Sequence, residues 1–297
     1  RGLFSDVEPK GELKSKRMGT VAEARKFILR NRIDIVYCAL PGTQRNEITE
    51  LMEFCESHTI RFRVIPSAES FIPVVKTTSL EFHGSVPTGA LRREPLDIAR
   101  NRTIKRAFDI VFSFLVITLV FTWLFPILAI MVKLSSRGPV FFKQKRLGRD
   151  NHPFVCWKFR SMRMNAEANS KQATKNDPRV TRVGAFLRKS NLDEMPQFIN
   201  VLFGQMSVVG PRPHPVRLND RYRDIVDKYM VRHFVRPGIT GWAQVNGYRG
   251  ETNTPELMEK RIQLDVWYLE NWSFKLDLKC VLKTVTNMLG GKEKFAY

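Results

Sequence analysis

Cysteine is scarce in this sequence, and its four cysteines lie far apart. None belongs to a Cys-x-x-Cys motif or to a cysteine–histidine spacing that would hold zinc. A disulfide framework is excluded too, because such frameworks are dense in cysteine and belong to small secreted domains. From this use of cysteine we expect the catalytic part to face the cytosol. The start of the sequence shows no signal peptide. The cysteines are Cys38, Cys55, Cys156 and Cys280.

Motifs of several common protein classes are missing as well. The sequence has no Gly-x-Gly-x-x-Gly or Walker loop, so nothing supports nucleotide binding of that kind, and it has no internal repeat. It contains no recognisable DNA-binding motif, so we expect no nucleic-acid partner. With 43% hydrophobic and 26% charged residues, wholesale disorder and collagen-like structure are excluded.

Positive charge, in contrast, is abundant. Lysine and arginine number 49 against 29 aspartates and glutamates, which gives a formal net charge of +20. Such a charge indicates an acidic partner: a nucleic acid, an anionic membrane or a phosphorylated substrate. At 297 residues the chain is long enough for one large domain or two ordinary ones.

One segment carries no charge over 23 residues, from Ile110 to Val132. As a helix it would be about 34 Å long at ~1.5 Å per residue, enough to cross a hydrocarbon core of ~30 Å. Both flanks are basic, although positive charge marks only the cytoplasmic side of a spanning helix. Pro126 removes a backbone N–H within the run, and Thr122 lies close enough to satisfy a freed backbone group. A spanning helix and a re-entrant helix that returns to the same side are equal alternatives on this pattern.

The residues before this segment alternate between strands and helices. Thr20–Glu23 is typical of a capping box at a helix start, and Ile33–Leu40 and Ile60–Ile65 are apolar runs rich in β-forming residues. Between these runs, Glu47–His58 has helical spacing, so we expect a parallel β-α-β arrangement. Residues 1–75 thus predict the end of an α/β domain whose beginning is missing, with scaffolding or self-association as its simplest role.

The part after the uncharged segment predicts an α+β domain, and it contains the first chemical candidate, Asp193-Glu194. Pro196 belongs in a first helical turn, so the two acids can simply favour the helix dipole. Several arginines nearby change this interpretation. We expect them to lower the pKa of Asp193 and keep it ionised, so that it can bind Mg²⁺ or attack phosphorus.

Basic residues supply candidates for phosphate binding. Gly210-Pro-Arg212-Pro holds an arginine between two prolines, in a stiff loop that presents its guanidinium at little entropic cost. Arginine can bind phosphate through two hydrogen bonds at once. A plain rigid turn and a solvated surface are the alternatives for these residues. The substrate-binding candidates are Lys158, Arg160, Arg188, Arg212 and Arg236.

Residues 92–297 resemble one family, the polyprenyl-phosphate glycosyl-1-phosphate transferases. These are the monotopic phosphoglycosyl transferases of bacterial glycoconjugate assembly. Within the family, the resemblance points to the undecaprenyl-phosphate glucose phosphotransferase subgroup of exopolysaccharide and colanic acid synthesis. The strings that carry it are KRAFDIVFS, GPVFFKQKRLG, KFRSM, NDPRVTRVGAFLRKSNLDEMPQF, MSVVGPRPH, RPGITGWAQVNGYRGET and LDVWYLENWSFKLDLK.

The resemblance implies a fold: a partial Rossmann-like parallel domain, a re-entrant membrane helix broken at Pro126, and an α+β catalytic domain with amphipathic interfacial helices. In that subgroup four membrane helices come first, so this chain would lack them and part of the Rossmann-like domain. We expect residues 274–289 and Trp267 or Trp272 to lie along the bilayer surface, although core packing alone would explain each tryptophan. The expected domains are 1–75 (Rossmann-like), 76–103 (connecting segment), 104–134 (membrane helix) and 135–297 (catalytic).

The resemblance also implies a mechanism. Asp193 would attack the β-phosphate of a UDP-sugar, which releases UMP and forms a phosphoglycosyl-enzyme. Undecaprenyl phosphate would then take the phosphosugar. Mg²⁺ would be bound by Asp193 and Glu194, and Arg212 would hold the nucleotide.

The resemblance implies the bacterial inner membrane as the location, with the catalytic domain facing the cytoplasm. Glucose is the expected sugar, while galactose and N-acetylated sugars stay open. Homo-oligomerisation is also open. The alternative function is a membrane-anchored structural or regulatory protein of polysaccharide assembly that has no catalytic activity.

Overall fold

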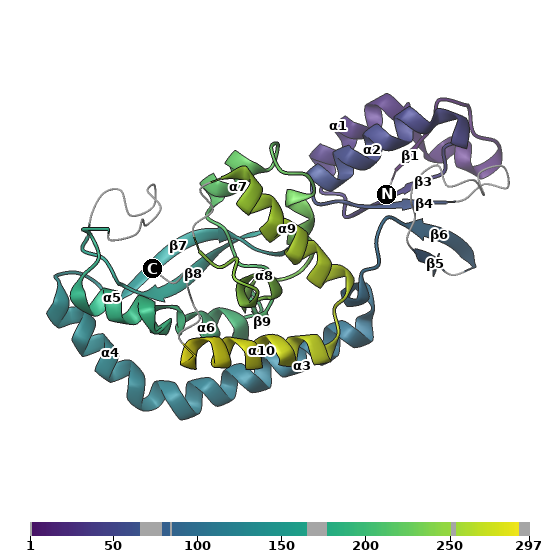
Figure 1. Cartoon of the computed structure of the whole chain (residues 1–297). Coiled ribbons are helices and arrows are strands. Elements are labelled where there is room, and N and C mark those ends of the chain that lie inside the picture. The colour runs from purple at the N-terminus through teal and green to yellow at the C-terminus, as the bar shows by residue number, and fades with distance from the viewer. Residues whose placement is uncertain (1, 66–78, 84, 165–176, 251–253, 291–297) are drawn as a thin grey trace. The chain divides into compact units, whose positions relative to one another are not determined.

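The chain forms two compact units, Arg1–Arg93 and Glu94–Tyr297 (Figure 1). The computed structural model describes residues 2–65, 79–83, 85–164, 177–250 and 254–290. The first unit has one hydrophobic cluster and the second has two. Each unit therefore has a core of its own and is described by itself.

The first unit contains a four-stranded sheet with the order β3-β4-β6-β5. Strands β3 and β4 are parallel and joined by helix α2, which confirms the predicted β-α-β unit. Helix α1 begins at the predicted box, where the Glu23 carboxylate accepts a 2.8 Å hydrogen bond from the Thr20 N–H. The elements are β1 (Leu3–Phe4), η1 (Gly11–Lys16), β2 (Arg17–Gly19), α1 (Val21–Asn31), β3 (Ile35–Cys38), η2 (Gly42–Gln44), α2 (Arg45–Ser57), β4 (Arg61–Val64), β5 (Ser79–His83) and β6 (Val86–Ala90).

Residues 76–103 are more than the connecting segment that the sequence suggested. Their described part contains β5 and β6, which pair antiparallel with each other, and β6 also pairs antiparallel with β4. The parallel arrangement therefore holds in this sheet for β3 and β4 alone. Strand β6 contains Pro87 and Gly89, which weaken a strand pattern and mask it in the sequence.

Apolar side chains of both helices form the core of the first unit. Ile28 of α1 and Ile48 of α2 are buried together with Phe62 of β4. Burial raises the pKa of the Cys55 thiol to about 12, so this thiol stays protonated. All four cysteines of the chain are free and buried.

The second unit combines one long helix with shorter helices and two small sheets (Figure 1). Strands β7 and β8 are antiparallel, and β9 and β10 are parallel. The elements are η3 (Pro95–Asp97), α3 (Ala99–Val116), η4 (Ile117–Phe121), α4 (Thr122–Ser135), β7 (Phe141–Leu147), η5 (Arg149–Asn151), β8 (Pro153–Phe159), α5 (Arg182–Lys189), η6 (Leu192–Glu194), α6 (Gln197–Leu202), β9 (Ser207–Val209), α7 (Val216–Tyr222), η7 (Tyr229–Phe234), β10 (Gly238–Thr240), α8 (Trp242–Val245), α9 (Pro255–Glu270) and α10 (Phe274–Leu289).

The uncharged segment lies within a continuous helix, Ala99–Ser135, that is long and apolar enough to cross a membrane. Helix α3 passes through the π-helical turn η4 into α4, and the helix bends between α3 and α4 (Figure 1). A break at Pro126 was expected, but Pro126 lies inside α4 and the irregular turn ends five residues before it. The physical reason is that proline cannot donate to the carbonyl four residues earlier and crowds it, so the deformation falls on the preceding turn. The hydroxyls of Thr118 and Thr122 donate to carbonyls there, at 2.9 and 3.0 Å.

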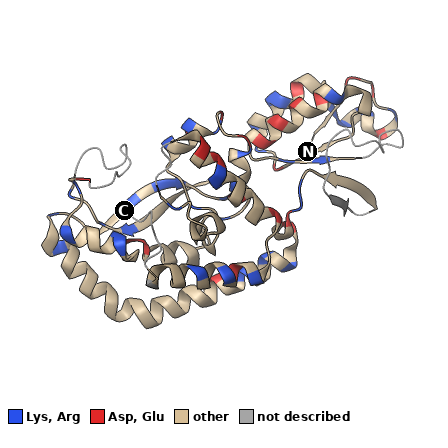
Figure 2. Cartoon of the chain, in the orientation of Figure 1, with Lys and Arg blue, Asp and Glu red and all other residues tan. Residues whose placement is uncertain are grey.

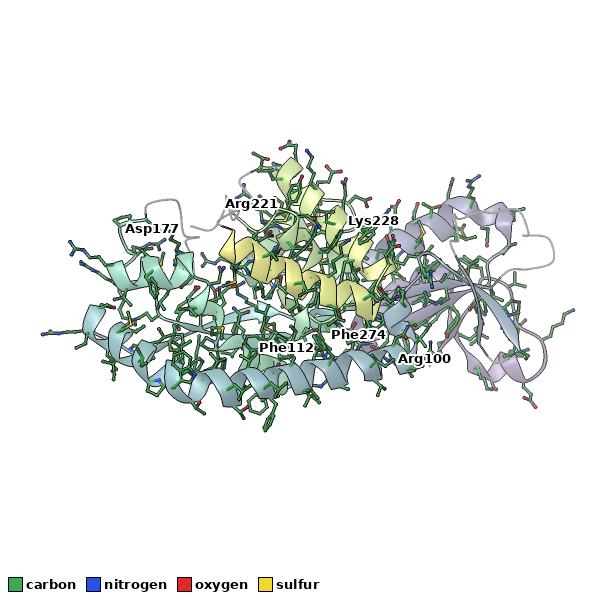
Figure 3. The ribbon with its side chains drawn as sticks, turned by 60° about the horizontal axis from the view of Figure 1, so that its bottom comes forward. Arg100, Phe112, Asp177, Arg221, Lys228 and Phe274 are labelled. Carbon is green, nitrogen blue, oxygen red and sulfur yellow. The ribbon has the colours of Figure 1, made fainter. Side chains whose placement is uncertain are left out.

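Both halves of this helix pack against the rest of the second unit. In α3, Lys105 forms a 2.7 Å ion pair with Asp277 of α10, and Figures 1 and 3 show α10 running alongside α3. In α4, Leu128 and Val132 pack with Phe159 of β8. The opposite face of the helix is exposed and apolar, and Figure 2 shows that its middle carries no charged residue. The exposed apolar residues are Ile104, Ile110, Val111, Phe114, Leu115, Leu119, Trp123, Ile127, Ile130 and Leu134.

Helix α10 has the amphipathic character that the sequence predicted. Phe274, Leu278, Leu282 and Val285 form an exposed apolar stripe on it. Of the two tryptophans considered for the bilayer surface, Trp267 is exposed, whereas Trp272 is buried and donates to Asp277. Only Trp267 therefore keeps the interfacial role open.

The outer edge of strand β8 is closed by a side chain of α6. The Asn200 amide accepts a 3.1 Å hydrogen bond from the Trp157 N–H and donates one of 2.7 Å to the Val155 carbonyl. Asn200 is buried, so its amide replaces the hydrogen bonds that a third strand would make. Helix α6 is thereby attached to the β7–β8 hairpin.

Candidate active site

Two neighbouring turns bring the acidic pair of the sequence to the interior. Thr181 caps the start of α5, and Asn191 ends that stretch with a positive φ of 58°, which asparagine tolerates well. The chain then forms η6, in which Asp193 and Glu194 are both buried. Pro196 is the N-cap of α6, so it lies just before the first helical turn in which the sequence placed it, and its φ of −58° suits a helix start.

Three cations surround the carboxylate of Glu194. Lys158 of β8 donates to Oε1 at 2.6 Å. Arg212 donates to both oxygens, at 2.7 Å to Oε1 and 3.1 Å to Oε2, and Arg249 donates to Oε2 at 3.2 Å. Burial alone would raise the pKa of Glu194, but the charges of Arg212, Lys158 and Arg249 outweigh it and hold this pKa well below its ordinary value.

The carboxylate of Asp193 has a different environment, although it is the next residue. It is 8% exposed and has no hydrogen-bond partner among the residues that the structure describes. Burial and the neighbouring negative charge of Glu194 raise its pKa above the ordinary value. The prediction of a lowered pKa is therefore wrong, because burial and the charge of Glu194 outweigh the lowering effect of Lys158, Arg188 and Arg212.

The loop that carries Arg212 is fixed at three consecutive carbonyls. The Pro211 carbonyl accepts a 2.9 Å hydrogen bond from the Gly238 N–H. The Arg212 carbonyl accepts from Arg232, and the Pro213 carbonyl accepts from Arg146. A Cβ on Gly238 would lie 2.1 Å from the backbone nitrogen of Gly210, so glycine is required for this close approach. The loop is therefore rigid, as its two prolines predicted.

Of the other predicted phosphate-binding residues, only Arg188 lies near the acidic pair. Its Nε donates to the Ser161 hydroxyl at 2.8 Å, and its Nη1 and Nη2 have no hydrogen-bond partner in the described parts of the chain. Burial lowers the pKa of Arg188, and the charge of Asp193 partly offsets this shift, as expected for neighbouring side chains. Arg188 thus has two donors available for an anion.

Arg160 and Arg236 do not join this site. Arg160 donates to carbonyls at the end of α4, 3.2 Å to Val132 and 2.6 Å to Ser136, and so caps that helix. Arg236 has Arg106 and Arg149 as charged neighbours rather than the acidic pair. The sequence shows the basic residues but not which carbonyls or charges the fold brings to them.

Sequence reasoning did not single out Arg249 or Arg146. Arg249 follows Gly247, whose φ of 96° allows the turn that returns the chain to Glu194. Arg146 lies on β7, the strand paired with the one that carries Lys158, and burial lowers its pKa. The only sequence signal for Arg249 was its place in the string RPGITGWAQVNGYRGET, which did not by itself indicate a role.

The residues present fit a magnesium ion only in part. No group of three or more histidine, cysteine or carboxylate residues that could hold a metal exists in the described ranges. Both oxygens of Glu194 already accept hydrogen bonds from cations, so this arrangement leaves Asp193 as the available carboxylate. Magnesium at phosphate-transfer sites is commonly bound by one or two carboxylates together with substrate phosphates, and such a donor set is compatible with Asp193.

Comparison with known proteins gives a family match and related enzymes. The family described as "Bacterial sugar transferase" matches residues 100–291. A UDP-glucose:undecaprenyl-phosphate glucose-1-phosphate transferase of Escherichia coli (strain K12) is 44% identical over 285 residues, which is 96% of this chain and 60% of the relative. The protein of the same description from Xanthomonas campestris pv. campestris is 41% identical, over 94% of this chain and 57% of the relative.

A third relative differs in its sugar. A UDP-N-acetylgalactosamine-undecaprenyl-phosphate N-acetylgalactosaminephosphotransferase of Aeromonas hydrophila is 44% identical over 190 residues, 63% of this chain and 44% of the relative. The chain thus spans 60% or less of the length of each of these three relatives.

Proposed function

The chain belongs to the bacterial sugar transferase family, and from this we propose that it transfers a sugar-1-phosphate from a UDP-sugar to undecaprenyl phosphate and releases UMP. The observation that carries the proposal is the unequal pair of carboxylates. Glu194 is neutralised by three cations, whereas Asp193 has no hydrogen-bond partner among the described residues. An unpaired buried carboxylate beside a cluster of cations is suited to attack a phosphate anion.

The proposed reaction has two steps. In the first, a carboxylate oxygen of Asp193 forms a bond to the β-phosphorus, and the bond from that phosphorus to the bridging oxygen breaks, so UMP leaves with the electron pair. In the second, an oxygen of undecaprenyl phosphate attacks the same phosphorus and the bond to Asp193 breaks. Asp193 returns as a carboxylate, and the product is a lipid diphosphate carrying the sugar.

The cations around the pair would lower the repulsion between carboxylate and diphosphate. Four side chains with positive charge, Lys158, Arg188, Arg212 and Arg249, accompany two carboxylates. The surplus of positive charge is preassembled, so little reorganisation is needed when phosphate binds. We assign Arg188 and Arg212 to the phosphates of the donor. The Nη nitrogens of Arg188 have no partner among the described residues, and those of Arg212 each keep a second hydrogen besides the one on Glu194.

Magnesium is part of the proposal, held by Asp193 and by oxygens of the diphosphate. When bound, it would supply charge neutralisation on the transferring phosphate. Glu194 contributes by fixing Lys158, Arg212 and Arg249 in place. This differs from the expectation that both carboxylates bind the metal.

The fold supports attachment to one membrane leaflet rather than a span. Arg106 of α3 donates to two carbonyls at the end of α6, both at 2.6 Å, and Arg160 binds the end of α4. Both ends of the helix are therefore held by the same unit, and a spanning helix would require that unit on both sides of the bilayer. We propose that the helix is re-entrant, that it inserts its exposed apolar face together with α10, and that the unit faces the cytoplasm of the bacterial inner membrane.

The topology can be tested with single cysteines in a cysteine-free background. Cysteines at Ser85 and at Lys228, which lie before and after the helix, are treated with an impermeant thiol reagent outside intact cells. We expect neither to react, while both react after the cells are broken. Reaction of the Ser85 position in intact cells would mean that the helix spans the membrane.

Glucose is the proposed sugar, because the relatives that align with 94–96% of this chain carry glucose in their description. The relative named for N-acetylgalactosamine aligns with 63% of this chain at a similar identity. The test is UMP release by the full chain in lipid nanodiscs, with undecaprenyl phosphate, Mg²⁺ and UDP-glucose, UDP-galactose, UDP-N-acetylglucosamine or UDP-N-acetylgalactosamine.

We expect the highest turnover with UDP-glucose, and without the lipid acceptor a single burst of UMP with the sugar phosphate retained on the protein. Asp227→Asn is the matched control for Asp193→Asn and should keep full activity, because the Asp227 side chain is 84% exposed and lies outside the site. Faster turnover with another sugar would overturn only the choice of glucose. Absence of UMP release with the whole panel would favour the non-catalytic structural or regulatory alternative.

A further inference from the structure

Behind the cations that hold Glu194 lies a second, fully buried group of charged residues. Arg232 of η7 and Arg261 of α9 are 3% and 5% exposed, and Asp265 of α9 and His214 are equally buried. Arg232 forms a 3.0 Å ion pair with Asp265. Burying two guanidinium groups costs desolvation free energy, so the presence of both in the interior calls for an explanation.

Each buried arginine contacts the backbone beside one arginine of the site. Arg232 donates through Nη2 to the carbonyl of Arg212. Arg261 donates through Nη2 to the carbonyl of Gly250, the residue after Arg249. Arg212 and Arg249 are the two arginines that bind Glu194.

Helix α9 connects these two contacts. Arg261 and Asp265 lie four residues apart, on one face of α9, so one rigid element holds both loops. His214 lies between the arginines, within hydrogen-bonding distance of Arg232 and 3.4 Å from Arg261. Burial and then the charge of Arg232 hold the pKa of His214 well below its ordinary value, so its neutral ring can accept hydrogen bonds between two cations.

We infer that Arg232 and Arg261 are positioning residues, which hold the backbones of Arg212 and Arg249 so that both guanidinium groups stay on Glu194 and Asp193 keeps no cation partner. Through this arrangement α9 sets the charge distribution of the site without touching substrate. The kinetic test of this inference rests on the proposed function, and a second test does not.

The kinetic test uses Arg232→Lys, which keeps the buried charge for Asp265 but cannot reach Asp265, His214 and the Arg212 carbonyl at once. We expect kcat/KM for UDP-glucose to fall about 5- to 100-fold, mainly through KM. In an Arg212→Ala background the same change is expected to add less than about twofold, because its effect passes through Arg212. Arg261→Lys should likewise lower kcat/KM in the parent protein and add little further loss in an Arg249→Ala background.

Two controls separate positioning from general destabilisation. Arg217→Lys changes an exposed arginine of α7 and should have no effect in either background. Arg261→Lys combined with Arg212→Ala should give close to the product of the two single effects. Equal loss from Arg232→Lys with and without Arg212, or no loss in the parent protein, would overturn the inference.

The second test needs no turnover. Arg212→Ala leaves the buried Glu194 with fewer partners and should lower the melting temperature of the full chain in nanodiscs. In the Arg232→Lys background this drop should be smaller, because Arg212 is already displaced from Glu194. Equal drops in both backgrounds would contradict the positioning role, while absence of UMP release with intact coupling would contradict only the proposed function.

Discussion

Two buried ionic clusters in the second unit differ in how completely their groups are paired. The cluster around Lys105 is balanced: its amine donates to the Val209 carbonyl, to the Tyr268 hydroxyl and to Asp277, so all three donors are used. Asp277 in turn accepts from Trp272 and Tyr268. These hydrogen bonds stabilise the packing of α3 against α10 and leave no donor of Lys105 for a ligand.

The cluster around Glu194 is unbalanced. Positive side chains outnumber carboxylates, Arg188 has two unused N–H-bearing nitrogens in the described structure, and Asp193 has no partner there. The difference teaches that the two clusters use their charge differently: one completes the hydrogen bonds of its lysine, and the other leaves Asp193 and part of Arg188 available for a ligand. Substitutions in the two clusters should therefore separate activity from stability.

The largest expected effect is on activity, from Asp193→Asn. Loss of the attacking carboxylate should lower UMP release by about 10⁴-fold or more, the scale seen when covalent nucleophiles are removed. The melting temperature should change little, because Asp193 has no hydrogen bond to lose among the described residues. Glu194→Gln should instead keep trace activity. Turnover near that of the parent protein for Asp193→Asn would refute the covalent mechanism.

The next effect is on stability, from Lys105→Met. It leaves Asp277 as an uncompensated buried charge and should cost about 3–5 kcal/mol of unfolding free energy. Per folded molecule, UMP release should stay close to that of the parent protein. Lys275→Met, on the exposed side of α10, is the matched control and should cost under about 0.5 kcal/mol. A loss of turnover without a loss of stability would show that the two clusters are not separate.

Arg212→Ala should give an intermediate effect on activity. Removing charge-assisted hydrogen bonds worth about 1.5–3 kcal/mol corresponds to a loss of about 10- to 150-fold in kcat/KM for the UDP-sugar. Dependence on undecaprenyl phosphate should change far less. Steady-state kinetics with each substrate varied in turn provide the measurement, and equal losses for both substrates would place Arg212 elsewhere in the mechanism.

The smallest effect concerns pH and a buried group outside both clusters. Burial lowers the pKa of His233 to about 3; its Nδ1 lies 3.2 Å from the Gly148 carbonyl, and its Nε2 is buried without a partner among the described residues. Between about pH 6.5 and 3 the unfolded chain therefore binds a proton that the folded chain does not. The free energy of unfolding should therefore decrease as the pH is lowered through this window, by up to about 1.4 kcal/mol per pH unit for this histidine.

His233→Gln keeps a donor for Gly148 and removes the titration. The melting temperature should then fall less steeply between pH 7 and 5 than in the parent protein. His214, with its pKa also held low, still contributes to the slope in both proteins. An unchanged slope would mean that His233 is not the group that links folding to protons.

Local patterns allowed much of the fold to be predicted. The box at Thr20, the strands flanking α2, and helix α10 all follow from neighbouring residues, so short-range spacing was sufficient. Strand β6 was missed because its pairing with β4 and β5 outweighs the low strand propensity of Pro87 and Gly89.

The candidate site was predictable in its members but not in their partners. Asp193, Glu194, Lys158 and Arg212 converge as expected, yet the direction of the Asp193 pKa depended on its burial and on the charge of Glu194, which the sequence did not show. Arg160 was expected at the same site and instead caps α4. Partners of this kind are set by tertiary contacts between residues far apart in the chain, which spacing does not encode.

The amide of Asn200 has a mechanical consequence. It attaches α6, which begins just after Glu194, to the strand that carries Lys158, with hydrogen bonds on both sides of Cys156. Because the two elements are fastened together, thermal motion should displace Lys158 and Glu194 as one body rather than against each other. The distance between Lys158 and Glu194 should then be the same before and during turnover, and any closing movement has to come from another part of the chain.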